Sequence, residues 1–127
     1  MGLALSLVAS SAGAAGQKAT GNAAAGEKVF ARCAACHQVG PAAKSGFGPA
    51  LNGVVGRKAA SLAGYTYSPA MKGAGLTWNA ATLERYLTAP AKLVPGTKMA
   101  FPGLSEAGDR ADVIAYLRQY DAQGRKK

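Results

Sequence analysis

Five consecutive residues, Cys33-Ala34-Ala35-Cys36-His37, constrain this chain more than any other feature. They contain both cysteines and the only histidine of the 127 residues, so we expect any metal chemistry to begin here. Two thiols three residues apart lie on the same side of a helical turn, where they can add to the two vinyl groups of one haem. The next residue, the histidine, is then placed to reach the iron. C-x-x-C-H is the attachment pattern of c-type haem.

Two other readings of the cysteine pair are weaker. Thiol–disulfide exchange of the thioredoxin kind belongs in a βαβ context, and no segment of this chain shows the alternation of a strand. A structural zinc ion needs four Cys or His ligands, and the chain has three in total. The adjacent histidine favours one covalently bound haem c, with a haem-free thiol oxidoreductase as the less favoured alternative.

The composition fits a single small domain with a basic surface. A chain of this length has a marginal core, which a large apolar cofactor would reinforce. The 15 basic and 6 acidic residues give a net charge of +9, which indicates an acidic partner surface or a membrane surface. Nucleic acid is excluded as a partner because the basic residues are scattered and no basic run is interleaved with aromatic residues. We expect a monomer.

The first 15 residues, MGLALSLVASSAGAA, are typical of a signal peptide. A short apolar run over 3–9 is followed by small residues, and Ala12-Gly13-Ala14 fits the A-x-A cleavage rule. This predicts export to the periplasm, which agrees with the attachment of c-type haem outside the bacterial cytoplasm. The run is too short to span a membrane, although an uncleaved segment that acts as an anchor is an alternative.

The remaining sequence predicts an all-α domain with long loops. Asn22 is a good N-cap for a first helix that reaches about Ala34. Ser68-Pro69 opens a short helix through Lys72, and Thr77 or Asn79 caps a helix that ends near residue 89. Ser105 caps a final helix that reaches about residue 119, with 38–64 and 90–104 as loops. The domain would cover 22–120, followed by a basic tail over 121–127.

A second iron ligand, if one exists, has few candidates. Met71, Met99, a lysine or water are the options, because no second histidine is present. Pro95 and Pro102 flank Met99 and stiffen its loop by fixing φ, so its thioether can be presented with little loss of entropy. A methionine that fills the core is the usual case, but this loop, together with the C-x-x-C-H motif, favours ligation by Met99.

The chain resembles class I cytochrome c, the group of bacterial cytochrome c2 and mitochondrial cytochrome c. The matching pieces keep the family order: GEKVFARCAACH (26–37), GFGPALNGVVGRKA (46–59), GYTYSPAMKGAGLTW (64–78), LERYL (83–87), PGTKMAF (95–101) and DVIAYL (112–117). The resemblance implies the cytochrome c fold, with helices and long loops wrapped around one covalent haem and with the first and last helices crossing. A side chain at Gly26 would hold off the helix that carries Tyr116.

The resemblance also implies a role for each matching residue. Cys33 and Cys36 form the thioethers, His37 and Met99 ligate the iron, and the Pro49 carbonyl accepts the second N–H of the histidine. Arg57, Tyr65, Tyr67 and Trp78 surround the inner haem propionate, and Thr97 lies near the other propionate. Tyr86 lies near the methionine sulfur, and Phe101 shields the haem edge. Met71 replaces the asparagine that is usual in mitochondrial relatives, which puts a second sulfur on the distal side.

The implied function is one-electron transfer rather than catalysis, because an iron with His and Met ligands excludes substrate. Partners would be a quinol–cytochrome c reductase on one side and a terminal oxidase, reaction centre or periplasmic reductase on the other. They would dock transiently at the haem edge through Arg32, Lys44, Lys92 and Lys98. The alternative is an open-site haem protein, either gas-binding or peroxidase-like.

Overall fold

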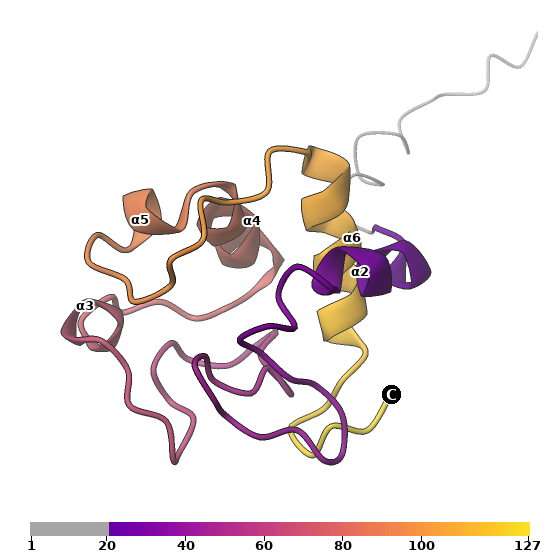
Figure 1. Ribbon diagram of the computed structural model, residues 1–127, viewed down its shortest axis with the longest axis horizontal. Coiled ribbons are helices and arrows are strands. Elements are labelled where there is room, and N and C mark those ends of the chain that lie inside the picture. The colour runs from indigo at the N-terminus through magenta and orange to yellow at the C-terminus, as the bar shows by residue number, and fades with distance from the viewer. Residues whose placement is uncertain (1–20) are drawn as a thin grey trace, which may run out of the picture.

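The computed structural model describes residues 21–127, so the expected signal segment over 1–15 lies outside the described residues. Helices account for the regular structure in this range, and its extended pairing is limited to the isolated bridges Lys58–Thr77 and Tyr120–Lys126. This confirms the all-α prediction. No helix within 21–127 has both the length and the apolar character that a membrane crossing requires. The helices, labelled in Figure 1, are α2 (Ala23–Phe30), α3 (Pro69–Lys72), α4 (Ala80–Thr88), α5 (Pro90–Leu93) and α6 (Ala107–Arg118).

The first and last described helices cross, as expected. α2 packs against α6, and Figure 1 shows the two helices crossing at a steep angle. A Cβ atom at Gly26 would overlap the backbone carbonyl of Asp112 and would lie 2.8 Å from the Cβ of Tyr116. The Asp112 carboxylate also accepts a hydrogen bond of 2.7 Å from the Asn22 backbone N–H, so the start of α2 is tied to α6. The glycine is therefore required by close helix packing.

Three predicted helix starts are confirmed by their capping bonds. The side-chain oxygens of Asn22, Ser68 and Asn79 accept from backbone N–H groups at 3.0, 3.1 and 2.9 Å, which satisfies donors that the helix itself leaves free. Asn79 and Thr82 form a reciprocal capping box. These local side-chain bonds define where the helices begin.

Other helix boundaries differ from the predictions. α2 ends at Phe30 rather than near Ala34, because the backbone N–H groups of 31–33 bond to carbonyls three residues back and tighten the chain into turns. The segment over 90–104, predicted as a loop, begins with the short helix α5, which Pro90 opens. The N-cap of α6 is Glu106 rather than Ser105, and it makes no side-chain capping bond.

The C-terminal residues, expected as a basic tail, fold back onto the domain. The Asp121 carboxylate accepts from the backbone N–H groups of Gln123 and Arg125, both at 2.9 Å, which closes a turn. Gly124 is buried against the Gly40 carbonyl and the Asn52 side chain. Figure 1 shows this last segment beside the loop that follows α2. The basic ends of Lys126 and Lys127 are exposed.

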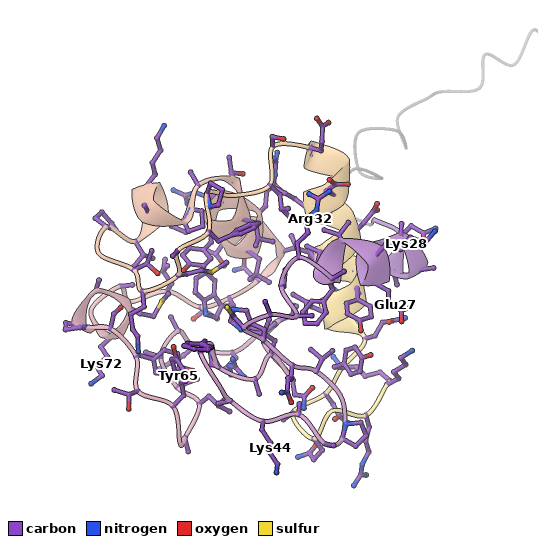
Figure 2. All side chains as sticks on the ribbon, in the orientation of Figure 1. Glu27, Lys28, Arg32, Lys44, Tyr65 and Lys72 are labelled. Atoms are coloured by element: carbon purple, nitrogen blue, oxygen red, sulfur yellow. The ribbon has the colours of Figure 1, made fainter. Side chains whose placement is uncertain are left out.

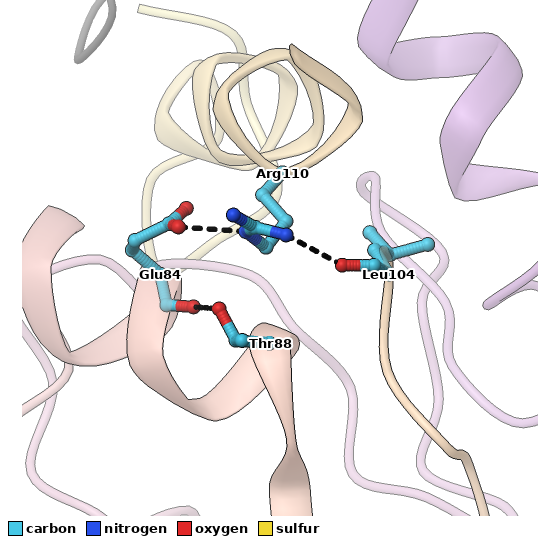
Figure 3. A network of polar contacts seen from close by, with 4 residues as sticks. All are labelled: Glu84, Thr88, Leu104 and Arg110. Carbon is cyan, nitrogen blue, oxygen red and sulfur yellow. Dashed lines mark hydrogen bonds and ion pairs between the residues drawn. The ribbon is translucent and has the colours of Figure 1, made fainter. Parts of the chain in front are cut away.

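Arg110 joins three segments around the end of the Met99 loop (Figure 3). From α6, its Nε donates to the Glu84 carboxylate of α4 at 2.6 Å, and its Nη1 donates to the Leu104 carbonyl at 2.7 Å. The Arg110 side chain is 12% exposed and the Glu84 side chain 40% exposed, so the arginine end of this ion pair is shielded from solvent and the carboxylate end is not. The Leu104 N–H in turn donates to the Leu87 carbonyl at 2.7 Å. Arg110 thus anchors the loop at its C-terminal end.

We expect Arg110→Met to lower the free energy of unfolding by about 1–2 kcal/mol, because it removes a charge-assisted hydrogen bond and leaves the Leu104 carbonyl without its donor. Arg118→Met is the matched control, since Arg118 is an exposed arginine of the same helix, and we expect it to change stability by less than about 0.5 kcal/mol. Urea unfolding followed by circular dichroism measures both variants. Equal midpoints for the two variants would show that Arg110 does not anchor the loop.

Candidate haem site

The twelve expected cofactor-binding residues all line one cavity of about 520 Å³. The cavity lies between the turn that follows α2, the loops over 46–78, the helix α4 and the Met99 loop. Its remaining lining is largely aliphatic and includes Leu51, Val54, Leu83, Leu87, Val113 and Leu117. The twelve residues are Cys33, Cys36, His37, Pro49, Arg57, Tyr65, Tyr67, Trp78, Tyr86, Thr97, Met99 and Phe101.

The two cysteines lie on a tight turn at one wall of the cavity. The Cys36 and His37 N–H groups both donate to the Cys33 carbonyl, at 3.1 and 2.9 Å, so the turn is closed by its own backbone. Cys33 is half-buried, and burial raises the pKa of its thiol, while Cys36 is exposed. Both side chains contribute to the same cavity wall, as attachment to one flat cofactor requires.

The protonation state of His37 follows from its partner. Its Nδ1 lies 2.7 Å from the Pro49 carbonyl oxygen, which accepts only, so Nδ1 is the donor. This is the hydrogen bond expected from the resemblance. Burial lowers the pKa of the imidazole, although the bond to Pro49 acts in the opposite direction. A neutral ring with its proton on Nδ1 leaves the Nε2 lone pair free for a metal ion, and the carbonyl bond makes that nitrogen more basic.

Gly48 gives the His37 ring its space. A Cβ atom there would lie 2.5 Å from Cε1, 2.8 Å from Nδ1 and 2.9 Å from Nε2 of His37. Any larger residue would therefore push the ring aside or break its bond to Pro49. Sequence reasoning did not identify Gly48 as a site residue, although its place directly before Pro49 was the available signal.

Arg57 is held at the cavity wall with one donor unused. Its Nη1 donates to the Asn52 carbonyl at 2.9 Å, and its Nη2 donates to the Ala50 carbonyl at 3.2 Å. Its Nε is buried and, within the described residues, has no hydrogen-bond partner. A buried donor of this kind is unfavourable unless an acceptor meets it. The residues fit a haem in this respect, because a haem brings carboxylates to a cavity that is otherwise apolar.

Met99 lies in the loop over 94–103, next to a cluster of hydrogen-bonded side chains. The hydroxyls of Tyr86 and Thr97 lie 2.7 Å apart, and the Met99 N–H donates to the Thr97 hydroxyl at 3.4 Å. Burial raises the pKa of the Tyr86 phenol. The Tyr86 ring also packs on Trp78, with 5.0 Å between ring centroids. The cluster orders the backbone that carries the Met99 thioether. Met71, on α3, lines the same cavity.

Tyr65 and Tyr67 use their hydroxyls to hold loops. The Tyr65 hydroxyl donates to the Phe47 carbonyl at 2.8 Å, and the Tyr67 hydroxyl accepts from the Leu62 N–H at 3.3 Å. Their rings meet edge to face at 4.8 Å. Lys98 lies over the Tyr65 ring, with its Nζ 5.2 Å from the centroid. This part of the cavity wall is therefore built by aromatic packing between two loops.

The four cations expected to bind partners are placed differently. Arg32 and Lys98 line the cavity, whereas Lys44 and Lys92 lie outside its lining. Arg32 forms an ion pair of 3.5 Å with Asp109, so part of its charge is neutralised. Lys98 Nζ donates to the Thr66 carbonyl at 3.0 Å and is held close to the fold. Lys44 points away from the fold into solvent in Figure 2.

Comparison with known proteins agrees with this geometry. The family model described as cytochrome c matches residues 23–121. The chain is 57% identical to cytochrome c2 of Rhodoblastus acidophilus over 106 aligned residues. The alignment covers 84% of this chain and 99% of that protein. The chain is 54% identical over 109 residues to cytochrome c-554 of Methylosinus trichosporium, with 86% and 83% covered. The solved structure of cytochrome cH from Methylobacterium extorquens superposes with a TM-score of 0.74 at 53% identity, covering 78% of this chain and 99% of that one.

Proposed function

This chain belongs to the cytochrome c family, and we propose that it carries single electrons between membrane redox complexes in the periplasm. As a family member it holds one covalently attached haem c and takes part in electron transfer. The observation that carries the proposal is that one cavity is lined both by the C-x-x-C-H turn and by the Met99 loop. His37 and Met99 would then both be available to hold the iron of a bound haem, which would leave no position for a substrate and favours a carrier over an enzyme.

We assign the iron ligands to His37 and Met99 and the thioether bonds to Cys33 and Cys36. The haem supplies a one-electron iron couple, whose potential a thioether ligand raises. The chain keeps both ligands in place: Pro49 and Gly48 orient the histidine, and Thr97 supports the backbone of the methionine. Rigid ligands limit the rearrangement that accompanies electron transfer.

We assign the haem carboxylates to the region of Arg57, Tyr65, Tyr67 and Trp78 and to Thr97. Support comes from the unpaired Nε of Arg57, which an anionic oxygen would satisfy. The apolar lining around it excludes water and keeps the local dielectric low, which strengthens that contact. We assign Phe101, which is half-buried and lines the cavity, to the shielding of the cofactor edge.

Partners dock weakly at the mouth of this cavity, through Arg32, Lys44, Lys92 and Lys98. Candidates are a quinol–cytochrome c reductase as donor and a terminal oxidase, reaction centre or periplasmic reductase as acceptor. The net charge of +9 favours acidic partner surfaces, and screening by salt would slow their association. The pairing of Arg32 with Asp109 gives it a smaller share of this attraction than Lys44 has.

The accessibility of the reduced iron to carbon monoxide tests the carrier against an open-site haem protein. With His37 and Met99 both bound, we expect carbon monoxide to bind the reduced protein slowly, over minutes, because the methionine must leave first. Stopped-flow spectroscopy measures this rate. Rapid binding in proportion to the carbon monoxide concentration would contradict the carrier function and favour a gas-binding or peroxidase-like protein.

A further inference from the structure

Phe47 is the one large hydrophobic side chain in 21–127 that is left largely in solvent, at 89% exposed. A phenylalanine stabilises a fold mainly through burial, and the other residues of 21–127 bury little of the Phe47 side chain. Its position is specific, because it lies at the rim of the haem cavity, between Gly46 and Gly48.

The backbone around Phe47 is held rigidly. Its carbonyl accepts from the Tyr65 hydroxyl at 2.8 Å. The Gly46 N–H donates to the Gly48 carbonyl, and the Gly48 N–H donates to the Cys36 carbonyl, both at 2.9 Å. Gly48 is also pressed against the His37 ring. The phenyl ring is therefore presented on a fixed turn, and a partner that buried it would lose little conformational entropy in doing so.

The charged residues of the chain segment that contains Phe47 all have one sign. Residues 31–83 contain no Asp or Glu, and they contain five basic residues: Arg32, Lys44, Arg57, Lys58 and Lys72. Lys44 precedes Phe47 by three residues and is exposed. On the other side, Lys98 is fixed over the Tyr65 ring that holds the Phe47 carbonyl. An exposed aromatic ring thus lies among cations, with no neighbouring carboxylate in its stretch of the chain.

We propose that Phe47 is the apolar anchor through which an electron-exchange partner with an acidic surface docks at the cavity mouth. This rests on the carrier function proposed above and adds the residue that makes close contact. Charged rims steer partners together, while a central aromatic residue that enters an apolar depression supplies much of the affinity. The partner is a protein whose carboxylates surround an apolar depression that fits one phenyl ring.

The test compares Phe47→Ala with Phe47→Leu and with two charge variants, all as holo-protein. The measurement is the rate of electron transfer from the reduced protein to purified cytochrome c oxidase over a series of salt concentrations. We expect Phe47→Ala to lower kcat/KM about tenfold at every salt concentration and to leave the salt dependence unchanged. We expect Phe47→Leu to keep most of the wild-type rate of electron transfer to the oxidase. We expect Lys44→Gln to weaken the salt dependence. Lys28→Gln is the control and matches the wild type, because the Lys28 side chain extends outward from α2 at the edge of the molecule (Figure 2).

Three outcomes overturn the anchor. The first is an oxidase rate for Phe47→Ala equal to that of the wild type. The second is an equal loss in the one-electron reaction with ferricyanide, a small oxidant that needs no docking pocket. The third is a Phe47→Ala variant that no longer sediments with phosphatidylglycerol vesicles but keeps the wild-type oxidase rate. That result would assign Phe47 to binding a membrane surface. If the unaltered protein passes electrons neither to the oxidase nor to ferricyanide, the carrier function fails as well. An unaltered protein that reduces ferricyanide but not the oxidase overturns the anchor for this partner alone, and normal wild-type turnover confines the failure to Phe47.

Discussion

Met99→Ala is expected to lower the reduction potential by a substantial part of the roughly 0.8 V range that axial ligands set in haem proteins. The thioether favours Fe(II), so its removal stabilises the oxidised state. The variant also leaves one axial position open, and the reduced protein then binds carbon monoxide rapidly. Potentiometry measures the reduction potential, and stopped-flow spectroscopy measures the rate of carbon monoxide binding. The substitution does not change His37.

Met71→Leu is the matched control for Met99→Ala, because Met71 places a second sulfur on the same cavity. Leucine keeps a similar volume and removes the thioether. We expect this variant to keep the sulfur-to-iron charge-transfer band of the oxidised protein and to bind carbon monoxide slowly. If Met71→Leu opens the iron and Met99→Ala does not, the distal ligand has been assigned to the wrong sulfur.

Gly26→Ala is expected to lower the free energy of unfolding by about 3 kcal/mol or more and the midpoint of thermal unfolding by roughly 10 °C or more. A single Cβ atom overlaps the Asp112 carbonyl, and backbone on both helices must move to make room. Circular dichroism of the holo-protein during heating measures the effect.

Gly108→Ala separates this packing effect from helix propensity. Gly108 lies in α6, and a Cβ atom there meets nothing within 4 Å. Alanine favours the helix, so we expect this variant to raise stability by up to about 1 kcal/mol. Two variants that changed stability in the same direction and by the same amount would contradict the account of the α2–α6 crossing.

The gathering of the expected residues around one cavity was predictable, because the pattern consists of rare residues at fixed spacing. A chain of 127 residues with one histidine and two cysteines allows few cofactor sites. The family resemblance supplied the other residues that line the same cavity. The caps at Asn22, Ser68 and Asn79 were predictable as well, since each bonds within its own first turn.

Features that depend on distant contacts were not predictable. Arg110 meets Glu84, 26 residues away, and no local pattern marks that pair. The exposure of Phe47 follows from how a turn is held by Tyr65, 18 residues later. The fold-back of the C-terminal residues requires a glycine at 124, because a Cβ atom there would overlap the Gly40 carbonyl. In each case tertiary packing, rather than local preference, decides the outcome.

An optical redox titration of the purified holo-protein tests the central claim. The claim is that His37 and Met99 both ligate the iron of a single haem, and that the protein carries one electron at a time. The account predicts one reversible wave for one electron, with a charge-transfer band from sulfur to iron in the oxidised protein that disappears on reduction. The absence of that band at neutral pH, or a protein that carries two free thiols and no covalent haem on a denaturing gel, would contradict it.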